Sequence, residues 1–140
     1  MAETYFGNIL ITPETSDSYG LKGSGTLAEG RLVELDTTLT DTPTVKYSIN
    51  NSPSVLGFVT SEWESGDLLT VYRRGKARLE DSGSGIAYGA RVGSAGSGKI
   101  KTYASGSVVG IVIDPAGITA SAFGNVLVDI VPANSIISVV

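Results

Sequence analysis

The chain has 140 residues, a net charge of −4, no histidine and no cysteine. A chain of this length can bury a core as one domain without disulfides or bound metal. The absence of histidine and cysteine excludes the usual zinc ligands, thiol nucleophiles and the side chain best suited to proton transfer near neutral pH. The net negative charge disfavours nucleic acid or an anionic membrane as a partner.

The residue usage predicts an all-β protein. There are 18 glycines, accompanied by many Val, Ile, Thr and Ser, a mixture typical of short strands joined by tight turns. No stretch approaches the roughly 18 apolar residues of a membrane span, and the first ten residues lack the basic-then-apolar layout of a secretory signal. We therefore expect a soluble, unprocessed chain.

The first 25 residues combine an apolar patch with a polar run, TPETSDSYG, that has neither helical nor strand periodicity. We predict an N-terminal arm over residues 1–25, followed by a single β domain over residues 26–140. Two interpretations of the apolar patch stay open: it is the first strand of the fold, or an arm laid across a neighbouring subunit. The patch consists of Tyr5, Phe6, Ile9, Leu10 and Ile11.

From Leu27 onward, turn-forming residues recur about every 8–12 residues, the rhythm of a β-sandwich or barrel. The links SEWESG and DPAGITASAFG are each long enough for one helical turn, and Asp114-Pro115 supplies an N-cap followed by proline at the first helical position. The predicted strands are residues 31–35, 44–49, 55–60, 68–73, 76–80, 99–103, 108–113, 126–131 and 135–139.

The sequence carries a weak internal duplication. LAEGRLV is echoed by IAYGARV, SVLGFV by SVVGIV, and GDLLTV by GNVLVD, in the same order and at offsets of 59, 53 and 58 residues. Two copies of one β unit packed around one core predict a small pseudo-symmetric barrel or sandwich. Gly57 and Gly110, inside apolar strands, then mark a sharp bend or a close approach of two backbones. Chance similarity among Gly- and Val-rich strands is the alternative.

The segment GSAGSGK, residues 93–99, has the spacing of a phosphate-binding loop. Such a loop needs Ser or Thr after the lysine and then a helix, whereas Ile100 follows Lys99 and the next residues alternate like a strand. We interpret the segment as a flexible Gly/Ser hairpin loop and expect no cofactor.

A cluster of basic residues is a candidate interaction site. Arg73, Arg74, Lys76 and Arg78 surround Gly75, which indicates a basic hairpin tip that either seats on an acidic partner or, the favoured interpretation, is a solvated turn that discourages aggregation.

Beside Trp63, the carboxylates of Glu62, Glu64 and Asp67 lie in a predicted turn without a cleft for acid–base catalysis. Trp63 itself is either a lid on the core or an exposed interface anchor. With no histidine to activate a hydroxyl and no G-x-S-x-G motif, we predict a non-enzymatic protein with no catalytic residues and no metal.

Taken in order, several segments resemble the decoration, or cement, proteins of phage capsids, over most of residues 27–131. No single segment is specific to these proteins, but the order of all the segments is. The segments are GRLVELD, VLGFV followed by a GD turn, LLTVYRRGKARLE, YGARV, a Gly-rich loop, VVGIVID and VLVDIV.

The resemblance implies a structural virion protein that binds the outer surface of a tailed-phage capsid and cements neighbouring capsomers. It implies a homotrimer, the major capsid protein as partner, and synthesis in the bacterial host cytoplasm, with no nucleic-acid, membrane or small-molecule partner. The residues expected at the capsid or subunit interface are Tyr5, Phe6, Ile9, Ile11, Trp63, Arg73, Arg74 and Lys76.

Three alternatives remain. A glycan- or receptor-binding module of a virion head or fibre would use exposed aromatic residues such as Trp63, Tyr72 or Tyr88. A small hydrolase would need a cleft around the acidic group. A ligand-binding barrel would need a deep apolar pocket.

Overall fold

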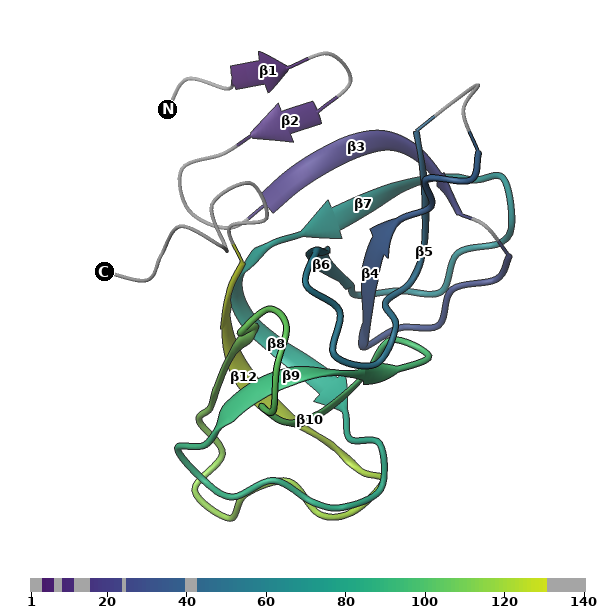
Figure 1. The fold of residues 1–140 in the computed structure, drawn as a ribbon. Helices are drawn as coiled ribbons and strands as arrows, with labels where there is room; N and C mark the ends of the chain where they lie inside the picture. Colours follow the sequence, from purple (N-terminus) through teal and green to yellow (C-terminus); the bar gives the residue numbers. More distant parts are fainter. Residues whose placement is uncertain (1–3, 7–8, 12–15, 24, 40–42, 131–140) are drawn as a thin grey trace.

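The structure is a computed structural model, and it describes residues 4–6, 9–11, 16–23, 25–39 and 43–130. Within these ranges the chain forms strands joined by turns, without a helix (Figure 1). The all-β prediction is therefore confirmed, while the predicted strand 135–139 lies outside the described residues. The strands are β1 (Thr4–Phe6), β2 (Ile9–Ile11), β3 (Ser16–Gly23), β4 (Arg31–Leu35), β5 (Thr44–Tyr47), β6 (Val55–Val59), β7 (Leu68–Tyr72), β8 (Arg74–Glu80), β9 (Arg91–Gly96), β10 (Lys99–Thr102), β11 (Gly110–Val112) and β12 (Phe123–Asp129).

The two links that could have held a helical turn form β-turns instead. In the second link, the N–H of Gly117 donates to the carbonyl of Asp114 at 2.8 Å, so that Pro115 occupies the corner of a tight turn. Gly117 has a φ of 73°, in the left-handed region that ends helical winding. Gly66, with a φ of 90°, has the same effect in the first link.

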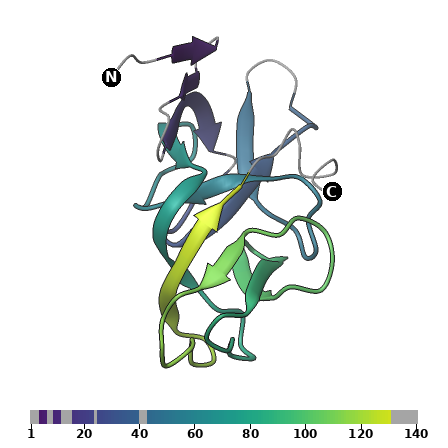
Figure 2. The same ribbon diagram turned by 90° about the vertical axis from the view of Figure 1, so that its left-hand side faces the viewer.

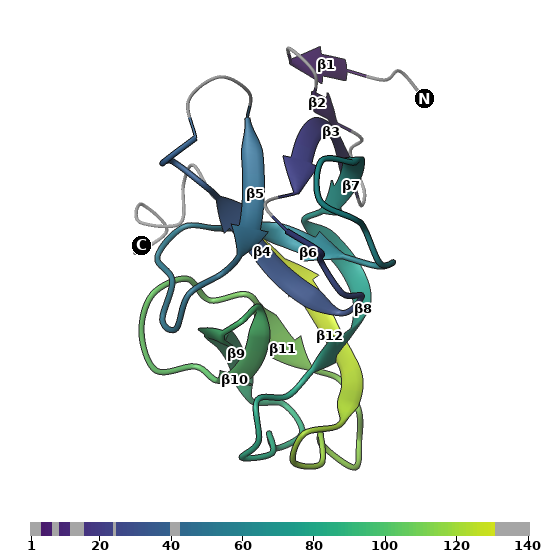
Figure 3. The ribbon, with the colours of Figure 1, turned by 90° about the vertical axis from the view of Figure 1, so that its right-hand side faces the viewer.

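The strands make two five-stranded units with the same topology. One sheet has the order β1-β2-β3-β5-β4-β6-β7 with an additional β3–β7 pairing, and the other has the order β10-β9-β11-β12-β8. The additional pairing closes β3–β7 into a ring, which we call the first barrel, and β8–β12, the second barrel, repeat its strand order. The first barrel lies above the second in Figures 1 and 3.

Each barrel is closed by one parallel pairing in equivalent positions. In the first barrel, β3 pairs parallel with β5 through Gly23 and Val45. In the second, Asp81, directly after β8, pairs parallel with Ile100 of β10. Since a closed barrel leaves few free strand edges, this arrangement satisfies the backbone of a small domain.

The predicted duplication is confirmed by the pairing register. Val33 lies opposite Gly57 in the first barrel, and Val92 lies opposite Gly110 in the second. The turns before β4 and β9 correspond as well. The N–H of Gly30 donates to the carbonyl of Val59 in the first copy, and the N–H of Gly89 donates to the carbonyl of Val112 in the second, both at 2.9 Å.

For the third pair of repeated segments, GDLLTV and GNVLVD, the predicted register is wrong. Phe58 pairs with Tyr72, and its counterpart Ile111 pairs with Leu127, so the two last strands are offset by 55 residues and not by 58. The glycines support this alignment. A Cβ on Gly57 would lie closer than 3.0 Å to the carbonyl oxygen of Tyr72, and one on Gly110 equally close to that of Leu127. The prediction of a close backbone approach at both glycines is confirmed.

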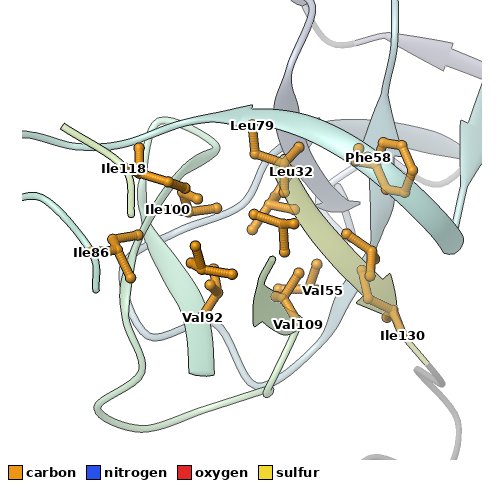
Figure 4. Close-up of a cluster of buried hydrophobic side chains, with 14 residues drawn as sticks. Leu32, Val55, Phe58, Leu79, Ile86, Val92, Ile100, Val109, Ile118 and Ile130 are labelled. Carbon is orange, nitrogen blue, oxygen red and sulfur yellow. The ribbon is translucent and has the colours of Figure 1, made fainter. Parts of the chain in front are cut away.

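The two barrels share part of their cores. Leu27, Val33, Val45, Val59, Leu69 and Val71 fill the first barrel. The larger cluster fills the second barrel and also includes Leu32, Val55 and Phe58 from the first (Figure 4). In β4, therefore, Val33 points into its own barrel whereas Leu32 points into the neighbouring core, as the period of two requires.

The basic cluster does not form a hairpin tip, so that prediction is wrong. β7 and β8 are separated by Arg73 alone, and β7 belongs to the first barrel whereas β8 pairs along its whole length with β12 of the second. The chain thus passes directly from one barrel to the other at Arg73. A hairpin here would have left β12 without β8 on one of its two sides.

The GSAGSGK segment forms a hairpin, although most of it is strand. Gly96 pairs with Lys99, which leaves Ser97 and Gly98 as a two-residue turn with φ values of 50° and 71°. Positive φ at both positions is the type I′ geometry that matches the twist of the flanking strands. Lys99 is followed by β10 and not by a helix, so the segment lacks the architecture of a phosphate-binding loop.

Candidate interaction surface

Four side chains form a row across the outside of the second barrel, which we call the outer row. Lys76 of β8 lies opposite Leu127 of β12, Leu127 opposite Ile111 of β11, and Ile111 opposite Arg91 of β9. Their strand neighbours Ala77, Val92, Val112 and Val126 are buried in the core, so alternation directs the row to solvent. Leu127 is 52% exposed and Ile111 44% exposed.

Positive charge borders this apolar pair. Lys76, Arg78 and Arg91 are exposed, and within the described part of the chain none of them has an ion-pair partner. The guanidinium of Arg78 lies 5.9 Å from the ring centre of Phe123. An apolar centre with unneutralised cations at its border is a surface that an acidic protein would complement.

The equivalent row in the first barrel is covered by protein. There Leu32 lies opposite Phe58, and Phe58 opposite Tyr72. Leu32 and Phe58 are 0% and 3% exposed because they pack into the core of the second barrel, and the ring of Tyr72 packs against the same cluster. The centres of the Phe58 and Tyr72 rings lie 5.9 Å apart.

A groove of about 370 Å³ runs beside the outer row, where the two barrels meet. Glu29 is the one carboxylate among the described residues that line it. A pair of carboxylates, as acid–base hydrolysis of a glycoside needs, is therefore not assembled there. The lining is mixed polar and apolar: Glu29, Gly30, Phe58, Thr60, Lys76, Ala77, Arg78 and Phe123.

The basic residues expected at an interface separate into two groups. The guanidinium of Arg73 donates to the carbonyl of Ile130 at 3.3 Å, and that of Arg74 forms an ion pair with Asp129, also at 3.3 Å. Both therefore hold the crossover between the barrels. Lys76 and Arg78 point outward from β8 and belong to the exposed surface.

Trp63 packs against the core of the first barrel, and its backbone pairs with Leu27 through N–H···O bonds of 2.8 and 2.9 Å. This position fits a lid over the core. Its indole Nε1 is buried without a hydrogen-bond partner in the described structure. Among the aromatic residues weighed for glycan binding, Tyr88 is 63% exposed, whereas Tyr72 and Trp63 pack against the two cores.

The acidic group lies in the turn that joins β6 to β7. Glu62, Glu64 and Asp67 are separate from the groove, and a carboxylate oxygen of Asp67 accepts a hydrogen bond from the N–H of Glu64 at 3.0 Å. The three residues thus form and surround a tight exposed turn.

The predicted residues of the N-terminal arm lie on a hairpin. Tyr5 and Phe6 belong to β1, Ile9 and Ile11 to β2, and β2 pairs with β3 at the edge of the first barrel. β3, which also falls within residues 1–25, pairs with both β7 and β5 and completes the barrel.

Within the described ranges, no group of three or more acidic, His or Cys side chains is placed to hold a metal ion. The same part of the chain contains no helix long and apolar enough to cross a membrane.

Sequence reasoning missed Arg91, Ile111 and Leu127. A signal for Arg91 was present, because the duplicated segments LAEGRLV and IAYGARV place it where the first copy has Leu32. A buried leucine replaced by arginine in the second copy indicates a row that has become exposed.

The sequence matches no protein-family model and no curated protein. The fold is similar to the crystal structure of the N base of the head fiber protein gp8.5 of bacteriophage phi29, with a TM-score of 0.64. The match covers 80% of this chain and 92% of that chain at 15% sequence identity. At this identity the likeness establishes a shared fold.

Proposed function

We propose that this chain is a non-enzymatic structural virion protein that binds the outside of a tailed-phage capsid and cements neighbouring capsomers. In this proposal the partner is the major capsid protein, the bound form is a homotrimer, and the protein is made in the host cytoplasm. The observation that carries the proposal is the fold shared with the base of a phage head fiber over 80% of the chain.

The order of sequence segments supports the proposal independently, since they resemble capsid decoration proteins over most of residues 27–131. The surface is consistent with attachment to protein. The exposed apolar residues of the outer row are bordered by cations, and the groove beside them has one carboxylate, Glu29, among the described residues that line it.

Binding of this kind stabilises a shell by mass action. A ligand that binds only the assembled lattice shifts the equilibrium toward that lattice with every copy bound. A trimer on a three-fold position makes three equivalent contacts, so the affinity of each contact can be modest while the whole complex stays attached.

The test is co-sedimentation of the purified protein with expanded, undecorated phage capsids, together with its mass in solution by light scattering. We expect saturable binding at a fixed ratio to the capsid protein, and a trimeric mass. Failure to bind expanded shells would refute the capsid role, and a monomeric mass at all concentrations would refute the trimer.

A receptor- or glycan-binding module of a virion head or fiber is the second candidate. It is favoured by the exposed ring of Tyr88, which lies on the second barrel in the turn before β9. A glycan array probed with the intact protein and with Tyr88→Ala separates the two. Specific binding lost in the variant would support this candidate over the first.

A further inference from the structure

We propose that the outer row is the face through which this protein binds the shell, and that its partner presents an apolar centre bordered by carboxylates. The proposal rests on the proposed function, which supplies the partner, and adds the surface and the chemistry of the contact. The residues that carry it are Lys76, Arg91, Leu127 and Ile111 of the row and the adjacent Arg78.

The first argument comes from the internal duplication. The row formed by Leu32, Phe58 and Tyr72 in the first barrel is a docking surface already in use, because the second barrel covers it. The outer row occupies the same strands and the same register in the second copy. Among the described residues nothing covers the outer row in this way, because Ile111 and Leu127 are 44% and 52% exposed.

The second argument is chemical. At the centre of the row, Phe58 and Tyr72 of the first barrel correspond to Ile111 and Leu127 of the second. At its end, Leu32 of the covered row corresponds to Arg91 of the open row. The apolar centre is retained and the border has become cationic. A partner with a purely apolar face would leave Arg91 and Lys76 desolvated and unpaired, which is costly, so the matching face must carry acidic groups.

The charge pattern also excludes two-fold pairing of this face with itself. A two-fold contact would bring Lys76, Arg78 and Arg91 of two copies together, and like charges opposite one another oppose association. The whole chain has a net charge of −4, so three unpaired cations in one region stand out against the rest of the surface.

A head-to-tail contact with a second copy is disfavoured by geometry. The acidic turn with Glu62, Glu64 and Asp67 lies in the β6–β7 connection at the right of Figure 1, whereas β12, drawn in yellow at the front of Figure 2, faces the opposite side. Opposed complementary faces build open chains and not closed rings. The occupant is therefore a different protein, the shell subunit.

The experiment compares two exposed leucines. Leu127→Asp introduces a carboxylate into the outer row, and Leu68→Asp makes the same change on the first barrel, where Leu68 is 66% exposed. In co-sedimentation with expanded shells, we expect Leu127→Asp to weaken binding about tenfold or more, the loss typical of a residue at the centre of an interface, and Leu68→Asp to stay within about twofold of the unmodified protein.

A second comparison tests the charges. The double variant Lys76→Glu, Arg91→Glu should lose binding to a similar degree, and binding of the unmodified protein should weaken as salt is raised from about 50 to 500 mM, because screening acts on exposed charge pairs. Urea unfolding midpoints equal to that of the unmodified protein confirm that these surface variants remain folded.

The outcomes are distinguishable. If the unmodified protein binds shells and Leu127→Asp binds equally well, the outer row is not the docking face although the proposed function stands. If the unmodified protein binds no shell, the proposed function fails. If Leu127→Asp instead converts an oligomer in light scattering to a monomer and leaves shell binding unchanged, the occupant is a second copy and the inference is overturned.

Discussion

Replacing Gly110 by alanine should destabilise the protein far more than an added methyl group suggests. The new Cβ would lie closer than 3.0 Å to the carbonyl oxygen of Leu127, on the neighbouring strand β12. Relief requires β11 and β12 to move apart, at the place where Gly110 pairs with Val128. Overpacking of this kind typically costs about 1–3 kcal/mol, and a contact with backbone belongs at the upper end because no rotamer change relieves it.

Gly93→Ala is the matched control. Its Cβ would meet the ring of Tyr103 at 3.2 Å, a side chain that can turn away, and the restricted unfolded chain returns about 0.5–1 kcal/mol. We therefore expect the free energy of unfolding, measured by urea titration followed by tryptophan fluorescence, to fall by about 2–3 kcal/mol for Gly110→Ala and by less than about 1 kcal/mol for Gly93→Ala. Equal stability of the two variants would show that the close approach of β11 and β12 is not a constraint.

Three further changes test other parts of the structure. Asp81→Asn should lower the free energy of unfolding by about 2–4 kcal/mol, because one buried carboxylate oxygen accepts hydrogen bonds from three backbone N–H groups at 2.9–3.0 Å and an amide oxygen accepts fewer. Glu62→Gln, in an exposed turn, is the control. Equal losses of stability in the two variants would contradict this role of Asp81. Trp63→Phe should change the free energy of unfolding by less than about 1.5 kcal/mol, because the indole N–H it removes is buried without a partner in the described structure. Since the variant has no tryptophan, its urea titration is followed by circular dichroism, and a much larger loss would contradict this account. Deleting residues 1–11 removes β1 and β2 but not β3; we expect an unchanged unfolding midpoint with weaker shell binding, and unchanged shell binding would remove this hairpin from the interface.

Most strands were predictable because apolar residues alternate between turn signals. β4 begins and ends where its pattern predicts, and β6 and β7 differ from prediction by one residue at the end. Three segments repeated in the same order made the duplication visible in the sequence, and the close backbone contacts of Gly57 and Gly110 agree with it. These features depend on local sequence patterns, which can be read from a single sequence.

β9 was missed because its small residues resemble a loop. Its central residue Ser94 is buried, and its hydroxyl lies 2.6 Å from that of Ser48 and donates to the carbonyl of Ile49 at 2.7 Å. Small polar side chains are needed there because the first barrel packs directly against the hairpin. This requirement comes from tertiary packing, so local sequence patterns do not show it. β3 was assigned to an arm for a related reason, since its place is set by backbone pairing on both sides.

The outer row could be predicted only in part. Lys76 was selected from its charged neighbourhood, but Arg73 and Arg74 were selected for a hairpin that does not exist. Leu127 and Ile111 become a surface only when β12 and β11 pair in register, because in the sequence alone they belong to ordinary apolar strands.

The shared core has a consequence for how the protein unfolds. Leu32, Val55 and Phe58 belong to the first copy by sequence and to the second by packing, so neither copy can open without uncovering the other. A duplicated chain built in this way should melt as one unit, without a half-folded species in which a single copy survives. Under denaturing stress, each molecule should then either stay folded throughout or unfold throughout.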